Sequence, residues 1–261
     1  MGFRFKKKLG QNFLTQISIT RKIAQVVDDK ENSLVVEIGC GDGRLTKQLC
    51  KLYSRVLGYE IDKEVIPYLY NNLKTVDNCI IICDDFMKRD LKKDLLTYQY
   101  DKLYIFGNLP YYITTPIIEK LINTNLDINE MVFMVQKEVG DRFVARPGSK
   151  DYGSITVFLN YYYDLKKEFF VSKKNFEPMP NVDSVVISFK KKENPCKVKN
   201  EELFFKLVKD SFTHKRKTLK NNLEGYNLEK VSEVLNKYDL DLSVRAENIP
   251  LEIFVEIANN L

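Results

Sequence analysis

Several residue types that mark common functional classes are scarce in this chain. Its 261 residues include one histidine, His214, and no tryptophan. A mechanism that needs a histidine base or two imidazole ligands must therefore use that residue, which disfavours triad hydrolases. The five cysteines form no Cys-x-x-Cys pair. We therefore expect neither a disulfide framework nor a metal site. The cysteines are expected to be core thiols in a protein from a reducing compartment.

Long apolar runs are also missing. No stretch approaches the roughly 20 apolar residues that span a bilayer, and the segment 1–8 is basic with no apolar segment behind it. We expect a soluble, cytoplasmic protein with no membrane partner. With 44% hydrophobic residues, the chain can bury a core as one large domain or as a main domain with a smaller one.

Positive charge is concentrated in one part of the chain. The net charge is a modest +5, yet the segment from Lys190 to Lys220 holds eleven Lys or Arg and four Asp or Glu, a local balance of 11 − 4 = +7. Such a segment is typical of proteins that bind phosphate backbones, although many charge runs are only solvated faces.

Short apolar segments alternate with helix-like segments between Leu34 and Lys137. This pattern predicts an α/β fold with a doubly wound, Rossmann-like parallel sheet, right-handed crossovers and ligands at the carboxyl ends of its strands. Leu45, Leu49 and Leu52 form one helical stripe, and residues 117–122 form another. The predicted strands are Leu34–Ile38, Arg55–Glu60, Cys79–Cys83, Lys102–Phe106 and Met131–Gln136.

The second half of the chain changes character. Gly153–Tyr163 is ambiguous between helix and strand; we favour a helix, followed by an antiparallel pair at Lys167–Val171 and Asp183–Lys191. The charged stretch Lys190–Asn200 indicates a linker. We therefore predict a sheet domain over 1–192, a linker over 193–200 and a small helical domain over 201–261, with helices at Glu201–His214, Leu228–Tyr238 and Leu251–Asn259.

The tetrapeptide Asn108-Leu109-Pro110-Tyr111 follows a predicted strand. Its amide can accept a hydrogen bond from an exocyclic amino group while its ring stacks on the attached base, which suggests a pocket for an extruded adenine or a similar amine. The alternative is an ordinary turn in which Pro110 fixes φ and Asn108 caps the next helix.

A glycine-rich loop joins the first predicted strand to its helix. Its sequence is Glu37-Ile38-Gly39-Cys40-Gly41-Asp42-Gly43, and its glycines permit close backbone approach to a ligand. Arg44 occupies the third position of the dinucleotide fingerprint, and the chain lacks the Gly-Lys-Ser/Thr of a P-loop. A cofactor without a polyphosphate fits better, and S-adenosylmethionine is the obvious candidate.

Acidic residues end the next two strands. Glu60 can accept both hydrogen bonds of a ribose diol. Asp84 or Asp85 can accept from an adenine amino group, with Phe86 against the ring. Glu60 could instead be a surface residue, and one aspartate a helix cap. Three suitable strand ends together predict a methyltransferase.

These residues and several further motifs closely resemble the ribosomal RNA adenine N6-dimethyltransferases over nearly the whole chain. The resemblance is greatest to the bacterial small-subunit (16S) branch, which is linked to kasugamycin sensitivity. Two positions depart from the family pattern: Met179 stands where Pro is usual and Asn181 where Lys is common. The matching motifs are Leu9-Gly10-Gln11-Asn12-Phe13-Leu14, Gln136-Lys137-Glu138-Val139, Tyr152-Gly153, the segment 176–184, the segment 212–221 and Arg245-Ala246-Glu247.

The resemblance implies roles for particular residues. It selects Asp85 over Asp84, and it makes Phe176 a second aromatic wall beside Tyr111, although Phe176 could equally be a hydrophobic anchor. Residue chemistry and the resemblance together predict the cofactor-binding residues Asn12, Leu14, Gly39, Gly41, Glu60, Ile61, Asp85, Phe86 and Asn108. They predict the catalytic residues Asn108, Leu109, Pro110, Tyr111 and Phe176. The expected RNA contacts are Lys215, Arg216, Lys217, Lys220 and Arg245, with a solvated face as the alternative.

The resemblance also implies a reaction. We expect a monomer that uses S-adenosylmethionine to dimethylate two adjacent adenosines in the 3′-terminal hairpin of small-subunit rRNA, within an immature 30S particle. Leu109 separates the chain from DNA adenine and protein glutamine methyltransferases, which resemble one another in having Pro there. Two alternatives remain: a large-subunit (23S) dimethyltransferase of the macrolide-resistance type, and a non-catalytic assembly or nucleic-acid-binding factor.

Overall fold

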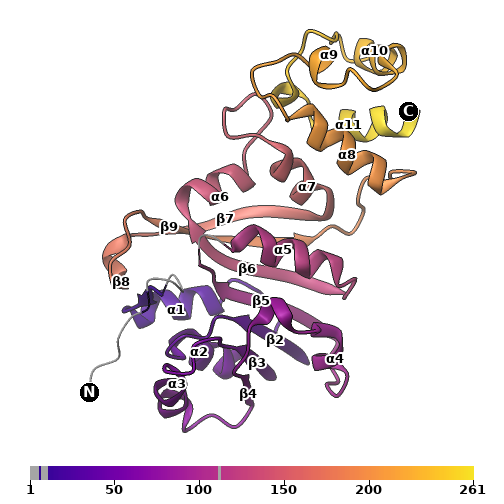
Figure 1. The fold of residues 1–261 in the computed structure, drawn as a ribbon. Helices are drawn as coiled ribbons and strands as arrows, with labels where there is room; N and C mark the ends of the chain where they lie inside the picture. The colour runs from indigo at the N-terminus through magenta and orange to yellow at the C-terminus, as the bar shows by residue number, and fades with distance from the viewer. Residues whose placement is uncertain (1–5, 7–10, 111–112) are drawn as a thin grey trace. The chain divides into compact units, whose positions relative to one another are not determined.

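The computed structural model describes residues 6, 11–110 and 113–261 (Figure 1). The chain folds into two compact units. The first contains residues 1–140 and 166–190, and the second contains residues 141–165 and 191–261. Residues 141–165 thus pack with the C-terminal helices, and the domain boundaries at 192 and 201 stay predictions.

A seven-stranded sheet organises the first unit. Its order is β4-β3-β2-β5-β6-β9-β7; neighbours from β4 to β6 are parallel, and β9 runs antiparallel to β6. The five strands predicted between residues 34 and 136 are all present, so the mostly parallel, doubly wound sheet is confirmed. The strands are β2 (Ser33–Ile38), β3 (Arg55–Tyr59), β4 (Cys79–Ile82), β5 (Lys102–Asn108), β6 (Ile128–Gln136), β7 (Tyr163–Val171) and β9 (Ser184–Lys191).

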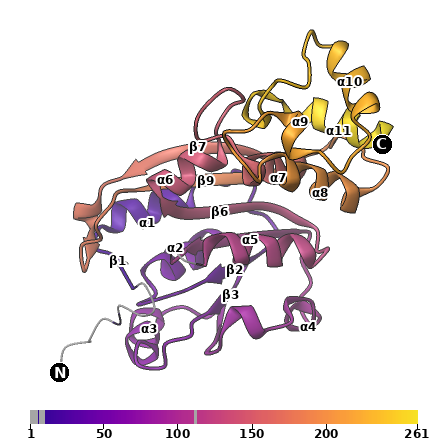
Figure 2. The same cartoon turned by 45° about the horizontal axis from the view of Figure 1, so that its top comes forward.

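Burial explains why these strands are so apolar. All six residues of β2 are buried, as are residues 103–107 of β5. Helices lie alongside the strands (Figure 2), and both predicted stripes are largely buried. The first unit's helices are α1 (Ile17–Ala24), α2 (Arg44–Leu52), α3 (Ile66–Leu73), α4 (Leu91–Leu95), α5 (Thr114–Asn123) and α6 (Lys137–Phe143), the last of which extends into the second unit, with short 3₁₀ turns η2 (Phe86–Lys88) and η3 (Lys173–Asn175).

The sheet register brings four strand ends together. Ile38, the last residue of β2, is aligned with Tyr59 of β3 on one side and with Gly107 of β5 on the other. Tyr59 is in turn aligned with Ile82 at the end of β4. The residues that follow these four strands therefore lie along one edge of the sheet, where open α/β sheets bind ligands.

A second, two-stranded sheet lies outside the predicted elements. β1 (Phe13–Leu14) runs antiparallel to β8 (Phe176–Glu177), with Leu14 aligned with Phe176. The Thr15 amide also donates to the Asn175 carbonyl oxygen at 2.8 Å. This pairing ties the N-terminal segment to the chain before β9.

The second unit is helical around its own core. The Gly153–Tyr163 segment forms helix α7, as favoured from the sequence, and the helix predicted from Glu201 ends at Ser211 rather than His214, because residues 212–217 turn. Aromatic rings of Tyr161, Phe204 and Phe205 pack together. The elements are α7 (Ser154–Tyr162), α8 (Glu201–Ser211), α9 (Leu219–Asn222), α10 (Leu228–Asn236), η4 (Ala246–Asn248) and α11 (Leu251–Asn260).

Two general expectations can be compared with the structure. All five cysteines are free, but Cys83 is exposed because it follows β4 into the turn, so the expectation that all five are core thiols is wrong. Within the described ranges, no helix is long and apolar enough to cross a membrane.

Candidate active site

The glycine-rich loop after β2 bends sharply across the strand ends. Gly39, Gly41 and Gly43 have φ values of 78°, 56° and 83°, a region that disfavours side chains. A Cβ on Gly41 would lie 2.6 Å from the Phe13 ring. The Gly39 amide donates to the Tyr59 carbonyl oxygen at 2.9 Å, which fixes the loop against β3.

Glu60 follows β3 and faces this loop. Its carboxylate accepts hydrogen bonds from the amides of Gly41 at 2.7 Å and Asp62 at 2.8 Å. Its side chain is buried, and this burial raises the pKa of Glu60 despite the two amide donors. The two bonds fix the carboxylate's orientation and leave lone pairs on both oxygens.

Glu37 is a further acidic residue of the site that the sequence reasoning did not single out. It is only 1% exposed, and Oε2 has no hydrogen-bond partner among the described residues. Burial raises the pKa of Glu37 well above its ordinary value. The available signal was a carboxylate in an otherwise apolar strand, because such a group is costly to bury without a purpose.

The tetrapeptide begins at the end of β5. The side-chain nitrogen Nδ2 of Asn108 donates to the Asn12 carbonyl oxygen at 3.0 Å. The backbone amide of Leu109 donates to the Met134 carbonyl oxygen at 3.2 Å. Asn108 does not cap α5, whose N-cap is Ile113. Tyr111 lies outside the described residues, as do Leu9 and Gly10 of the N-terminal motif.

Gly107 explains how this turn fits against β2. A Cβ there would lie 3.0 Å from the Ile38 carbonyl oxygen and 2.7 Å from Leu109 Cδ2. Leu109 is 1% exposed. A glycine before the tetrapeptide therefore lets the Leu109 side chain fold back against the sheet.

A pocket of about 840 Å³, open to solvent, joins these elements. Nine of the predicted site residues line it: Asn12, Leu14, Gly39, Gly41, Glu60, Ile61, Asn108, Leu109 and Pro110. The lining also contains Gln11, Phe13, Thr20, Glu37, Cys40, Asp42, Arg44 and Leu45.

Polar contacts hold the N-terminal segment over this edge. The Asp62 carboxylate accepts from Gln11 Nε2 at 2.6 Å and from Lys6 Nζ at 2.7 Å. The Arg44 guanidinium donates to the Leu14 carbonyl oxygen at 2.7 Å and pairs with Asp42 at 2.9 Å. The Arg44 cation is therefore already engaged by the protein.

Three predicted residues lie outside the pocket lining. Asp85 Oδ1 accepts from the Met87 amide at 2.9 Å, so Asp85 caps the turn η2. The Phe86 ring is buried and contacts Tyr59 edge-on, 5.2 Å between centroids. Phe176 is buried in the core cluster that includes Leu14. Their roles at the site stay predictions.

The predicted RNA contacts all lie in the second unit and are exposed. Lys215, Arg216 and Lys217 occupy the turn after α8, where the Lys215 ammonium donates to the Lys150 carbonyl oxygen. Lys220 lies in α9, and Arg245 precedes η4. Their exposure is what phosphate contacts require, and equally what a solvated surface would show.

The charge of the pocket decides which cofactor fits it. Three acidic residues, Glu37, Asp42 and Glu60, line it against one engaged cation, Arg44. A polyphosphate would find no unengaged cation among these described lining residues, whereas the sulfonium and ammonium groups of S-adenosylmethionine would be attracted to the carboxylates, and a bound cation would favour the ionised form of Glu37. Within the described residues, no cluster of three or more His, Cys, Asp or Glu is arranged to hold a metal ion.

The strand order, with antiparallel β9 between β6 and β7, and the pocket at the carboxyl ends of β2, β3 and β5 define a class I methyltransferase fold. Residues 2–261 match the model of one family in this class, ribosomal RNA adenine dimethylase. The chain belongs to this family.

Its relatives span essentially its full length. The ribosomal RNA small subunit methyltransferase A of Listeria innocua is 41% identical over all of this chain and 92% of its own length. The protein of the same name from Enterococcus faecalis is also 41% identical, over all of this chain and 91% of its own.

Two solved structures have the same fold. A dimethyladenosine transferase from Plasmodium falciparum matches with a TM-score of 0.77 and 26% identity, covering 94% of this chain and 95% of the other. The 23S rRNA methyltransferase ErmE matches with a TM-score of 0.75 and 22% identity, covering 95% and 99%.

Proposed function

We propose that this enzyme dimethylates N6 of two adjacent adenosines in the 3′-terminal hairpin of small-subunit rRNA, with S-adenosylmethionine as methyl donor. The observation that carries the proposal is the pocket that joins the Glu60 carboxylate to the Asn108 amide at one sheet edge. The full-length relatives named small subunit methyltransferases support the choice of rRNA. The substrate would be an immature 30S particle, met by a monomer in the cytoplasm during ribosome biogenesis.

The cofactor contacts that we propose depend on the acceptor groups at the strand ends. Glu60 would accept from the ribose hydroxyls, because its oxygens are oriented by Gly41 and Asp62 and retain lone pairs. Asp85 and Phe86 would receive the adenine. When bound, S-adenosylmethionine supplies an electrophilic methyl group. The remaining cofactor contacts would come from Asn12, Leu14, Gly39, Gly41, Ile61 and Asn108.

The target side depends on how Asn108 is held. Because Asn108 Nδ2 donates to Asn12, Oδ1 is the side-chain atom that remains as an acceptor for the substrate. Oδ1 and the Leu109 carbonyl oxygen would accept the two N6 hydrogens and aim the nitrogen lone pair along the transfer direction. Tyr111 and Phe176 would stack on the base. Transfer of the methyl group to the neutral N6 gives an ammonium cation, which is acidic and can lose its proton to water, so the scarcity of histidine is no obstacle.

RNA would reach this pocket with help from the second unit. The exposed cations Lys215, Arg216, Lys217, Lys220 and Arg245 would contact phosphates. Such contacts position the RNA, whereas the extruded adenine is read in the pocket. Both alternative functions, large-subunit methylation and non-catalytic binding, use the same scaffold and are separated by experiment.

The test offers the enzyme unmethylated 30S and 50S subunits and maps dimethyladenosine by primer extension. We expect two adjacent modified adenosines in the small-subunit RNA. Labelling confined to the 50S subunit would establish the large-subunit alternative, and no labelling of either subunit would favour a binding factor.

A variant pair tests the proposed amide role in the same assay. Asn108→Ala should lower the rate constant at saturation about 100-fold or more, as the loss of a transition-state hydrogen bond does, while RNA affinity stays within a few-fold. Asn71→Ala, on the exposed face of α3, is the control. Normal turnover by Asn108→Ala would refute the amide role.

A further inference from the structure

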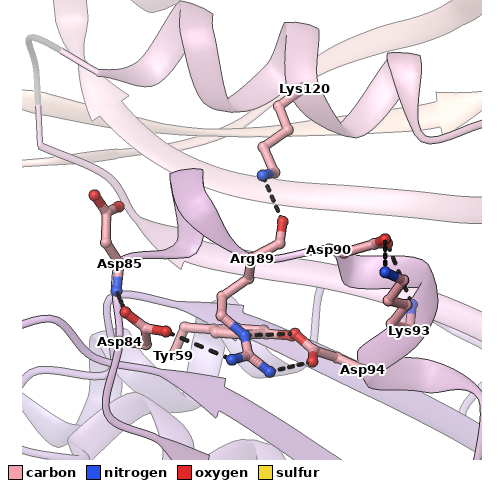
Figure 3. Close-up of polar contacts among 8 residues, drawn as sticks. All are labelled: Tyr59, Asp84, Asp85, Arg89, Asp90, Lys93, Asp94 and Lys120. Carbon is pink, nitrogen blue, oxygen red and sulfur yellow. Dashed lines mark hydrogen bonds and ion pairs between the residues drawn. The ribbon is translucent and has the colours of Figure 1, made fainter.

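The segment after β4 is held by a lysine from a distant helix (Figure 3). Lys120 lies on α5, and its ammonium group donates to the carbonyl oxygens of Met87 at 2.8 Å and Arg89 at 2.7 Å. These carbonyls stand at the end of the turn η2, where no helical amide follows to bond them. A cation at this end of the turn satisfies both acceptors and complements their partial negative charge.

The same lysine also contacts the aromatic ring of this segment. Its ammonium lies 5.4 Å from the centroid of Phe86, within the range of a cation–π interaction. The Phe86 ring also contacts Tyr59 edge-on. Phe86 is therefore held by Tyr59 of β3 and by Lys120 of α5.

An ion-pair network fixes the rest of the segment. Arg89 donates to the Asp94 carboxylate through Nε at 3.1 Å and through Nη2, and its Nη1 lies 3.5 Å from Asp84. The Tyr59 hydroxyl donates to Asp94 at 2.8 Å. Hydrogen bonding from Arg89 lowers the pKa of Asp94, which keeps this acceptor ionised.

Asp85 lies beside Asp84 at one side of this framework and takes no part in its ion pairs. Figure 3 shows its carboxylate turned away from Arg89, while the Asp84 carboxylate accepts from the Asp85 amide at 2.8 Å. Asp85 Oδ1 accepts from Met87, and Oδ2 makes no hydrogen bond within the described part of the chain. The framework thus fixes where Asp85 lies and leaves an acceptor for a ligand.

We propose that Lys120 is a positioning residue for adenine recognition, because it holds Asp85 and Phe86 where the cofactor's adenine would bind. This inference rests on the proposed function, in which Asp85 accepts from the adenine amino group. Lys120 also connects the two halves of the site: the first turn of α5 is bonded to the tetrapeptide, since Thr114 Oγ1 donates to the Pro110 carbonyl oxygen at 3.2 Å.

The test compares two ligands by isothermal titration calorimetry of the full chain. One is S-adenosylhomocysteine, and the other is its inosine counterpart, in which an oxygen replaces the adenine amino group. The wild type should prefer the adenine ligand at least tenfold, the scale of one hydrogen bond to a charged acceptor. Lys120→Met should weaken binding of the adenine ligand about tenfold and reduce that preference, while affecting the inosine ligand less.

Two further variants make the comparison specific. Lys120→Arg keeps the cation and should restore most of the preference. Lys93→Met removes an exposed lysine that pairs with Asp90, at 3.7 Å, and should change neither affinity. In methylation assays, Lys120→Met should raise the KM for the donor about tenfold and leave the rate constant at saturation within a few-fold, because the target side is intact.

The outcomes separate this inference from the proposed function. A wild type without preference for the adenine ligand contradicts the proposed role of Asp85. A wild type with the preference, and a Lys120→Met variant that retains it, overturns the role of Lys120. If Lys120→Met does not fold in a thermal melt, Lys120→Gln takes its place, and each result has the same meaning. Hydrogen exchange at the amides of residues 86–89 should be faster in the variant, and unchanged exchange also overturns the proposal.

Discussion

Two buried glutamates at neighbouring strand ends, Glu37 and Glu60, differ in the hydrogen bonds that their carboxylates accept. Both oxygens of Glu60 accept backbone amides, whereas Oε2 of Glu37 has no partner among the described residues. Burial raises the pKa of both carboxyls, and raises that of Glu37 well above its ordinary value. At a pH between the unfolded value of 4.5 and the raised folded pKa, ligand-free Glu37 therefore binds a proton when the chain folds.

This difference predicts how stability depends on pH. Because the folded pKa of Glu37 is raised, the unfolding free energy should fall as pH rises from the unfolded value of 4.5 to the folded pKa, by at most about 1.4 kcal/mol per pH unit. Glu37→Gln has no proton to lose, so its stability relative to the wild type should increase over that window. Urea unfolding of the ligand-free protein from about pH 5 to about pH 8 measures this.

The control for this prediction is Glu233→Gln, which changes an exposed glutamate in α10. It should shift the unfolding free energy by the same amount at every pH. If Glu37→Gln retains the full pH dependence of the wild type, Glu37 is ionised in the folded protein.

At the scale of elements, the sequence predicts those strands and helices whose burial requires a regular pattern of apolar residues. β2 to β6 were predictable because strands covered on both faces need uninterrupted apolar residues, and α2 and α5 because one buried face repeats at helical spacing. β1 and β8 could not be predicted this way, because two-residue strands carry no periodicity. Their pairing depends on residues more than 160 positions apart.

The same distinction applies to the site. Gly39, Glu60 and Asn108 follow strands, so the sheet topology alone places them together, as the pocket shows. Asp62 and Lys120 were missed because their partners are remote in sequence: Asp62 bonds Gln11, and Lys120 bonds a turn some thirty residues earlier. No local pattern marks such a contact.

The contact between Asp62 and the N-terminal segment gives an element-scale prediction. Asp62 has a side chain 1% exposed and binds both Lys6 and Gln11. Asp62→Ala should leave the Gln11 amide and the Lys6 cation without this acceptor, and raise hydrogen exchange at residues 11–14 about tenfold or more. Mass spectrometry of peptides from this region measures the rate.

A neighbouring carboxylate supplies the matched control. The Glu64 carboxylate pairs with Lys6 at 2.9 Å, and its side chain is 63% exposed. Glu64→Ala should change exchange by less than about threefold, because exposed ion pairs contribute little. Equal effects of the two substitutions would mean that Asp62 does not anchor the segment.

At the scale of the whole molecule, charge is divided along the chain. The formal charge of residues 190–220 is +7, whereas the net charge of the whole chain is +5. The remainder of the chain therefore carries a charge of 5 − 7 = −2. The first unit holds the acidic pocket, whereas Lys215, Arg216 and Lys217 are exposed on the second. Under the proposed function, the cationic cofactor would meet the acidic pocket and the polyanionic RNA would meet the exposed cations, a division that would oppose binding of RNA phosphates in the cofactor pocket.

This division predicts how RNA binding responds to salt. If these three cations each neutralise one phosphate, changing all three to Ala should weaken RNA binding and lower the slope of log affinity against log salt by about 2 to 3, because each contact releases roughly 0.7–0.9 counterions. Filter binding to 30S particles over a salt series measures the slope. The matched control is the triple alanine variant at Lys209, Lys230 and Lys237. These lysines lie in or next to α8 and α10, and their substitution removes the same total charge. Equal slopes for the two triple variants would show that net charge alone attracts the RNA and that residues 215–217 form a solvated surface.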